Sequence, residues 1–125
     1  MSLSGFAVEA YSDDFWSVLT DAQLEEESEK LNVEWNVCYE KFKDAEQDFQ
    51  TYKATNNVKT SNGPNGVVIK VNSHVICECD NVFNWTLYDE FCDYEEKIFD
   101  LEKKLREITE ESKDCLEEIE YRLIH

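Results

Sequence analysis

The 125-residue sequence has little proline, glycine or histidine, with one, three and two of these residues respectively. Disordered acidic chains are rich in proline and poor in aromatic residues, whereas this chain is 42% hydrophobic and 13% aromatic, so we expect it to fold. The sequence has only two histidines, His74 and His125, which argues against a catalytic triad or another histidine-dependent mechanism. We therefore expect a protein that is not an enzyme and that binds no cofactor.

Basic residues are also few: 12 lysines and arginines stand against 29 acidic residues, which gives a net charge of -17. This charge opposes contact with nucleic-acid phosphates and with anionic membranes, so the expected partner is a protein with a basic surface. The sequence shows no targeting signal and no apolar run of membrane-spanning length. Its five cysteines form an odd set without regular spacing, which indicates reduced thiols and a cytoplasmic location.

Two stretches of the sequence place apolar residues at alternating intervals of three and four, the spacing of a coiled-coil seam. The first seam consists of Leu24, Ser28, Leu31, Trp35, Cys38, Phe42, Ala45, Phe49 and Tyr52. The second consists of Phe91, Tyr94, Ile98, Leu101, Leu105, Ile108, Ser112, Cys115 and Ile119. This spacing predicts two long helices, over residues 20–54 and 84–123. The first is expected to open with a capping box of Thr20 and Gln23, and the second with Asn84 as its N-cap.

Between the long helices, the segment 58–80 has a cluster of turn residues followed by β-branched residues, which predicts a small antiparallel sheet. Strands over 67–71 and 75–79 are expected to form a hairpin with a three-residue loop, 72–74, because that register makes one face wholly apolar. The expected pairs are Val71 with Val75, Ile69 with Cys77, and Val67 with Cys79. An edge strand over 58–60 would make a third.

The predicted fold class is therefore α+β and predominantly α. It has two long antiparallel coiled-coil helices joined by a β-hairpin or a three-stranded meander, in a single domain over residues 1–125. A short separate helix is expected over 12–19, before the first long helix; the alternative is that these residues form the first turns of the long helix. In layout, although in no sequence motif, this arrangement resembles the subunits of the prefoldin chaperones, which also place a small β module between two long coiled-coil helices. The resemblance implies a chaperone subunit as one function to test.

Several seam residues are larger than the holes of a two-stranded coiled coil, which suit leucine, isoleucine and valine. Cores shared by three or four helices accommodate such rings, so either the segment 12–19 covers the seam or a second copy of the chain completes a helical bundle. We expect a homo-oligomer, most simply a homodimer. The seam residues expected in that interface are Trp35, Phe42, Phe49, Tyr52, Ile98, Leu101, Leu105 and Ile108. Apolar residues beside the seams that favour further contacts are Val33, Val37, Phe99, Leu116 and Leu123.

The stretch HVICECD, residues 74–80, brings a histidine and two cysteines together and raises the question of a metal site. Side chains alternate along a strand, so Cys77 and Cys79 are expected to share a face that His74 does not reach. Zinc would need further ligands, from Cys92 or from a second subunit. We therefore expect no metal, with Cys77 and Cys79 as the candidate ligands if one binds, and we interpret both cysteines as part of the apolar face of the hairpin.

The C-terminal helix carries a long series of carboxylates around its seam. Those expected to contact a partner are Asp93, Glu96, Asp100, Glu107, Glu110, Glu111, Asp114, Glu117 and Glu118. The favoured function is a non-catalytic, oligomeric scaffold or adaptor for protein–protein interaction. One alternative is an acidic inhibitor or nucleic-acid mimic, of the kind found among small viral proteins, that blocks a basic nucleic-acid-binding protein. A further alternative is a prefoldin-like chaperone subunit.

Overall fold

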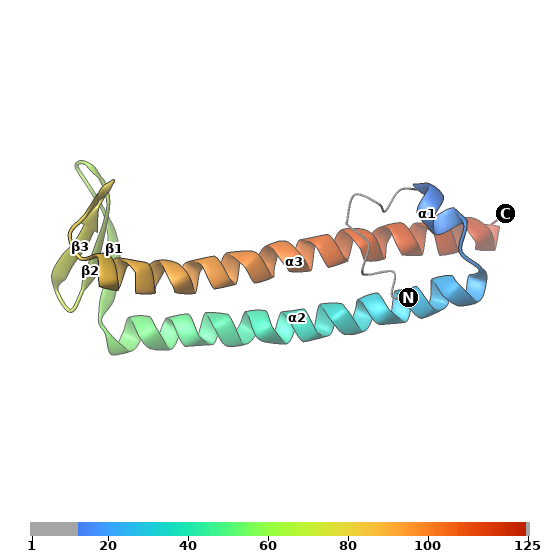
Figure 1. Cartoon of the computed structure of the whole chain (residues 1–125), viewed down its shortest axis with the longest axis horizontal. Coiled ribbons are helices and arrows are strands. Elements are labelled where there is room, and N and C mark those ends of the chain that lie inside the picture. Colours follow the sequence, from blue (N-terminus) through green and yellow to red (C-terminus); the bar gives the residue numbers. More distant parts are fainter. Residues whose placement is uncertain (1–12, 125) are drawn as a thin grey trace. The chain divides into compact units, whose positions relative to one another are not determined.

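A computed structural model describes residues 13–124 of the chain, and two long helices dominate it (Figure 1). The helices are α1 (Asp13–Ser17), α2 (Asp21–Thr55) and α3 (Trp85–Ile124). The strands are β1 (Val58–Gly63), β2 (Gly66–Val71), β3 (His74–Glu78) and β4 (Asn81–Val82). The predicted α+β class with mostly helical content is confirmed. The expected hairpin or three-stranded meander is wrong in its strand count, because the sheet is antiparallel with four strands in the order β1-β2-β3-β4.

Both predicted helix caps are present. Thr20 and Gln23 form a reciprocal capping box, in which the Gln23 N–H donates to Thr20 Oγ1 at 3.1 Å and the Thr20 N–H donates to Gln23 Oε1 at 2.9 Å. At the start of α3, the Leu87 N–H donates to Asn84 Oδ1 at 3.1 Å. These bonds satisfy N–H groups that have no partner within their own helix, so they fix where each long helix begins.

The predicted register of the hairpin is wrong beside the turn, where Val71 pairs with His74 and not with Val75. The loop between β2 and β3 holds two residues, Asn72 and Ser73, both with positive φ, as the two-residue turns that match strand twist require. Lys70 consequently pairs with Val75, and a β-bulge then leaves Ile76 as an extra residue on β3. The bulge restores the predicted pairing of Ile69 with Cys77 farther along the strands.

The bulge also explains which side chains enter the core. The alternation of side chains along a regular strand would point Ile76 away from the face of Val75 and Cys77. Ile76 is nevertheless only 1% exposed, and its neighbour Cys77 is buried as well. Val75, expected in the apolar face, is exposed at the surface. A one-residue shift moves side chains to the other face of a sheet. Between the turn and the bulge, β3 side chains therefore lie on the face opposite to the predicted one, and beyond the bulge they lie on the predicted face.

The described residues form two compact units, which we call unit 1 (residues 13–39 and 103–124) and unit 2 (residues 40–102). The two long helices each contribute to both units, and the whole sheet belongs to unit 2. The single domain predicted from chain length stays a prediction.

Unit 2 has an aromatic and aliphatic core beneath the sheet. Phe49 meets Phe91 edge-to-face with ring centroids 5.4 Å apart, and Tyr94 stacks on both Phe49 and Tyr52, at 5.7 and 4.6 Å. The buried residues of this cluster are Phe49, Tyr52, Ile69, Val71, Ile76, Cys77 and Phe91. The ends of both long helices are thus packed on the sheet by large rings that were predicted as seam residues.

Apart from the ring of Trp16, the core of unit 1 consists of aliphatic and cysteine side chains. In it α2 and α3 are antiparallel: Cys115 Sγ lies 3.6 Å from the carbonyl oxygen of Leu24, whereas the indole N–H of Trp35 donates to Thr109 Oγ1 at 3.2 Å. Higher residue numbers on α2 therefore face lower numbers on α3. The buried apolar residues of this unit are Trp16, Leu24, Leu31, Cys38, Ile108 and Cys115.

Candidate functional site

Three of the predicted interaction carboxylates converge in unit 2. Asp93, Glu96 and Asp100 recur at intervals of three and four along α3, so they lie on one face of that helix. Together with Asp44 and Asp48 of α2 they line a groove of about 830 Å³, which we call the acidic groove. The sequence analysis predicted the α3 carboxylates but missed those of α2. That the two sets share a groove is visible only once it is known how α2 and α3 pack.

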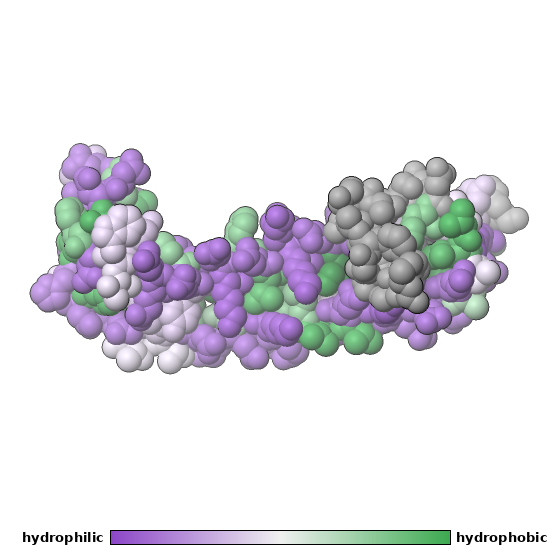
Figure 2. Space-filling model, viewed as in Figure 1, coloured by the Kyte–Doolittle hydropathy of each residue, from purple (hydrophilic) through white to green (hydrophobic). Residues whose placement is uncertain are grey.

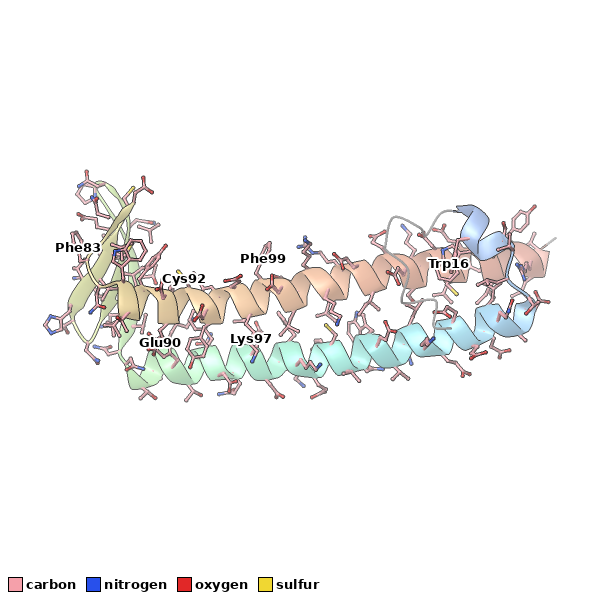
Figure 3. All side chains as sticks on the ribbon, viewed as in Figure 1. Trp16, Phe83, Glu90, Cys92, Lys97 and Phe99 are labelled. Atoms are coloured by element: carbon pink, nitrogen blue, oxygen red, sulfur yellow. The ribbon has the colours of Figure 1, made fainter. Side chains whose placement is uncertain are left out.

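Two lysines and one apolar residue complete the acidic groove. Lys41 and Lys97 line it, and Figure 3 shows Lys97 extending from α3 toward α2. Leu101 supplies apolar lining. Five carboxylates against two ammonium groups leave the groove negative, so it can receive cationic side chains while its own lysines offset part of the repulsion between carboxylates.

A second set of carboxylates lies in unit 1 and is less accessible. Glu27 of α2 is only 5% exposed, and burial raises its pKa, an effect that Lys30 opposes and Glu34 reinforces. On α3, burial and then the nearby charge of Glu34 raise the pKa of Glu111. Four of the predicted interaction residues, Glu107, Glu111, Asp114 and Glu118, are half-buried here. Glu110 and Glu117 are exposed, as expected of partner-facing residues.

Glu118 accepts a hydrogen bond from Arg122, a residue that the sequence analysis did not single out. The guanidinium of Arg122 donates to Glu118 Oε2 at 3.0 Å and to Asp21 Oδ1 at 2.8 Å. It also donates to the backbone carbonyls of Trp16 at 3.3 Å and Ser17 at 3.1 Å. Arg122 therefore ties α3 to α1 and to the start of α2. The spacing of four between Glu118 and Arg122 was the available signal, but it could not show the contacts with Trp16 and Ser17.

A second groove, in unit 1, is lined by three apolar residues and six polar or charged residues. Leu31 and Trp35 of α2 and Leu116 of α3 contribute apolar surface to a groove of about 540 Å³, which we call the apolar groove. Trp35 is fixed by its bond to Thr109 and by stacking on Tyr39, with centroids 4.9 Å apart. This groove can receive apolar side chains of a partner.

The apolar residues predicted beside the seams are all exposed. They are Val33, Val37, Phe99, Leu116 and Leu123. Figure 2 shows hydrophilic residues over most of the drawn surface with hydrophobic residues exposed between them, and Figure 3 shows Phe99 pointing away from α2. Two exposed aromatic residues, Phe83 just before α3 and Trp85 at its first position, were not predicted. Single exposed apolar residues are ordinary in proteins. These residues indicate an interaction surface only because several of them occur along the same helices.

The eight residues predicted as an oligomer seam are buried or half-buried within one chain. In unit 2, Phe49 and Tyr52 pack on Phe91, Tyr94 and the sheet, so the size of their rings is accommodated without a second chain. In unit 1, Trp35 is half-buried and borders the apolar groove. Their role in an oligomer stays a prediction.

The candidate metal ligands lie in different environments. Cys77 is buried in the unit 2 core and donates to the carbonyl of Cys79 at 3.4 Å. Cys79 follows the end of β3 with a positive φ and is exposed, so the expected shared face is wrong. His74 lies at the turn and pairs with Val71. Within residues 13–124, the structure contains no cluster of three histidine, cysteine or acidic residues that could hold a metal ion.

No protein-family model, curated protein or solved structure matches this chain. Among the helices that the structure describes, none has an apolar stretch long enough to cross a membrane. His125 lies outside the described residues.

Proposed function

We propose that the chain is a non-catalytic, acidic scaffold or adaptor that binds other proteins through the faces of its long helices. The observation that carries this proposal is the series of exposed apolar side chains among carboxylates, most clearly Val33 and Val37 on α2. Interfaces combine a desolvated apolar centre with a polar rim, and these helix faces offer both. The acidic surface adds selectivity for a basic partner, because complementary charge accelerates encounter and opposes acidic competitors.

Self-association along these faces is part of the proposal, in the form of a coiled-coil or bundle dimer. Val33 and Val37 are four residues apart and so occupy one side of α2. Replacing both, as Val33→Asn with Val37→Asn, should lower the mass measured by light scattering from dimer to monomer. The matched control is Glu25→Gln with Glu29→Gln, an exposed pair at the same spacing on the same helix. A monomeric mass for the wild type would remove the oligomeric part of the proposal.

An acidic inhibitor or nucleic-acid mimic is the second candidate, and the acidic groove is the observation that favours it. Carboxylates held on two helices can stand in for phosphates toward a basic protein. A mimic should bind a DNA-binding protein with an affinity that falls steeply as salt is added, whereas an adaptor using apolar contacts should be nearly insensitive to salt.

The groove can be tested by removing three of its charges. Asp93→Asn, Glu96→Gln and Asp100→Asn together should abolish competition with DNA if the chain is a mimic. The matched control changes the same number of exposed charges of unit 2 outside the groove: Glu46→Gln, Asp80→Asn and Asp89→Asn. Equal losses in the two triple variants would show that net charge acts rather than the groove.

A prefoldin-like chaperone subunit stays a third hypothesis, supported only by the layout of two long helices around a β module. Stoichiometric suppression of the aggregation of an unfolded client protein would support it, and no suppression would remove it.

A further inference from the structure

The apolar groove of unit 1 combines apolar residues with a polar and charged surround. Asn32 of α2 and Thr109 and Ser112 of α3 are the uncharged polar residues of its lining. Leu31 is almost completely buried, whereas Leu116 remains 48% exposed. The groove thus has a covered apolar residue at its base and an uncovered one at its side.

The apolar lining is held in place before any partner arrives. The indole N–H of Trp35 donates to Thr109 Oγ1, and the Thr109 hydroxyl in turn donates to the Leu105 carbonyl at 2.8 Å. Stacking on Tyr39 with an interplanar angle of 14° fixes the ring from another side. A partner would therefore meet a ring whose rotamer freedom is already reduced, which lowers the entropic cost of binding.

The length of the groove indicates the size of the segment that fits. On α3 its lining extends from Thr109 to Glu120, which at a rise of about 1.5 Å per residue is about 17 Å, or three helical turns. An open apolar groove between two helices suits an amphipathic helix that inserts residues at intervals of three and four.

The charged residues at the rim of the apolar groove indicate which kind of helix would bind there. The rim has Glu117 and Glu120 against Lys113, and the chain as a whole carries a net charge of -17. Lysine or arginine beside the apolar residues of an incoming helix would be attracted to the two carboxylates of this rim, whereas acidic flanks would be repelled by them.

We propose that the apolar groove is the docking site for a basic amphipathic helix, about three turns long, of a partner protein. This proposal rests on the adaptor function, to which it adds the site and the chemistry of the partner. Leu116 and Trp35 contribute the apolar contact, and Glu117 and Glu120 select the basic flanks.

The test uses a fluorescently labelled helical peptide with leucines on one face and lysines on its flanks, and the full-length protein. The peptide should bind by fluorescence polarisation, and a peptide with glutamates in place of the lysines should bind at least tenfold more weakly. Leu116→Asn should weaken binding at least tenfold because it removes a central apolar contact. Leu123→Asn, an exposed leucine of the same helix outside the groove, should leave binding unchanged.

Equal binding of the two peptides, or an unchanged affinity for Leu116→Asn with retained helical circular dichroism, would overturn the proposal. A fall in light-scattering mass caused by Leu116→Asn would also overturn it, because a second copy would then be the occupant. Failure of the peptide to bind while the Val33 and Val37 variant still changes the mass would remove this docking site and keep the scaffold function.

Discussion

The two compact units stabilise the same pair of helices by different means. Unit 2 packs large rings such as Phe49 and Phe91 beneath a four-stranded sheet. In unit 1, Trp16 is the one buried ring among aliphatic and cysteine side chains of the described residues, Glu27 is also buried, and Arg122 holds α1 by hydrogen bonds. Burial of apolar area dominates folding, whereas buried carboxylates and partly exposed ion pairs add little or oppose it.

This difference implies a division of labour within the chain. Unit 2 should be the more stable part, and unit 1 should open more readily and respond to pH and to partners. Regions that bind other molecules are often drawn from the less stable part of a structure. The apolar groove lies in unit 1, which fits that expectation.

The largest effect is expected from removing a ring of the unit 2 core. Phe91 is 5% exposed and meets Phe49 edge-to-face, so Phe91→Ala should lower the free energy of unfolding by about 3–5 kcal/mol. Chemical denaturation followed by circular dichroism measures the loss. Hydrogen exchange should show faster exchange first in peptides of β2, β3 and the start of α3.

Phe99→Ala is the matched control, since Phe99 lies on the same helix and is 57% exposed. Its cost should be within about 0.5 kcal/mol. Similar losses in the two variants would mean that Phe91 does not carry the core, and the contrast between the units would fail.

The long helices could be predicted because apolar residues repeated at intervals of three and four over several turns are typical of a helix and not of a strand. Their caps followed from the local sequence, as at Thr20 and Gln23. The turn of the hairpin and the pairing beside it could not be predicted, because an all-apolar face favoured a three-residue loop. The actual turn uses positive φ at Asn72 and Ser73 and corrects the register with a bulge, which no local pattern announces.

The candidate functional site likewise has features that the sequence could predict and features that it could not. The carboxylates of α3 were visible in the sequence, but only helix pairing shows that Asp93 shares a groove with Asp44 or that Glu27 is buried. Arg122 was missed because two of its four acceptors are backbone carbonyls, which carry no sequence signal. Contacts between segments distant in the sequence are therefore the part that the amino-acid pattern could not predict.

The second largest effect, after that of Phe91→Ala, is expected where α1 attaches to α3 in unit 1. Arg122→Gln removes the guanidinium that bridges Asp21, Glu118 and the backbone of α1. We expect α1 to detach locally, with a red shift of the emission of Trp16, which is buried, and faster hydrogen exchange in unit 1 alone. Arg106→Gln, an exposed arginine of the same helix, should change neither. Faster exchange in unit 2 peptides after Arg122→Gln would contradict the division between the units.

A smaller and opposite effect is expected at Glu27. Burial raises the pKa of this carboxyl above its ordinary value of 4.5, so the folded state binds more protons than the unfolded state between 4.5 and the raised value. The free energy of unfolding should therefore rise as the pH falls through that window and decrease as the pH rises through it. Glu27→Gln should stabilise the protein at pH 7 by up to about 1 kcal/mol and make this pH dependence shallower.

The neighbouring Glu26→Gln provides the control, because Glu26 is exposed and the two variants change the net charge equally. Its stability curve should be parallel to that of the wild type across the same pH range. If both variants flatten the curve equally, the pH dependence comes from net charge and not from the burial of Glu27.

The smallest effect is expected in the turn that set the hairpin register. Ser73 has a φ of 71°, a left-handed conformation that costs a side-chain-bearing residue about 1 kcal/mol and glycine almost nothing. Ser73→Gly should stabilise unit 2 by a few tenths of a kcal/mol, because glycine's greater freedom in the unfolded chain offsets part of the gain. Ser61→Gly, in β1 opposite Val68, should instead destabilise it by about 0.5–1 kcal/mol. Denaturation midpoints that move in opposite directions would support the two-residue turn, whereas a loss for both variants would favour a loop in which Ser73 is not left-handed.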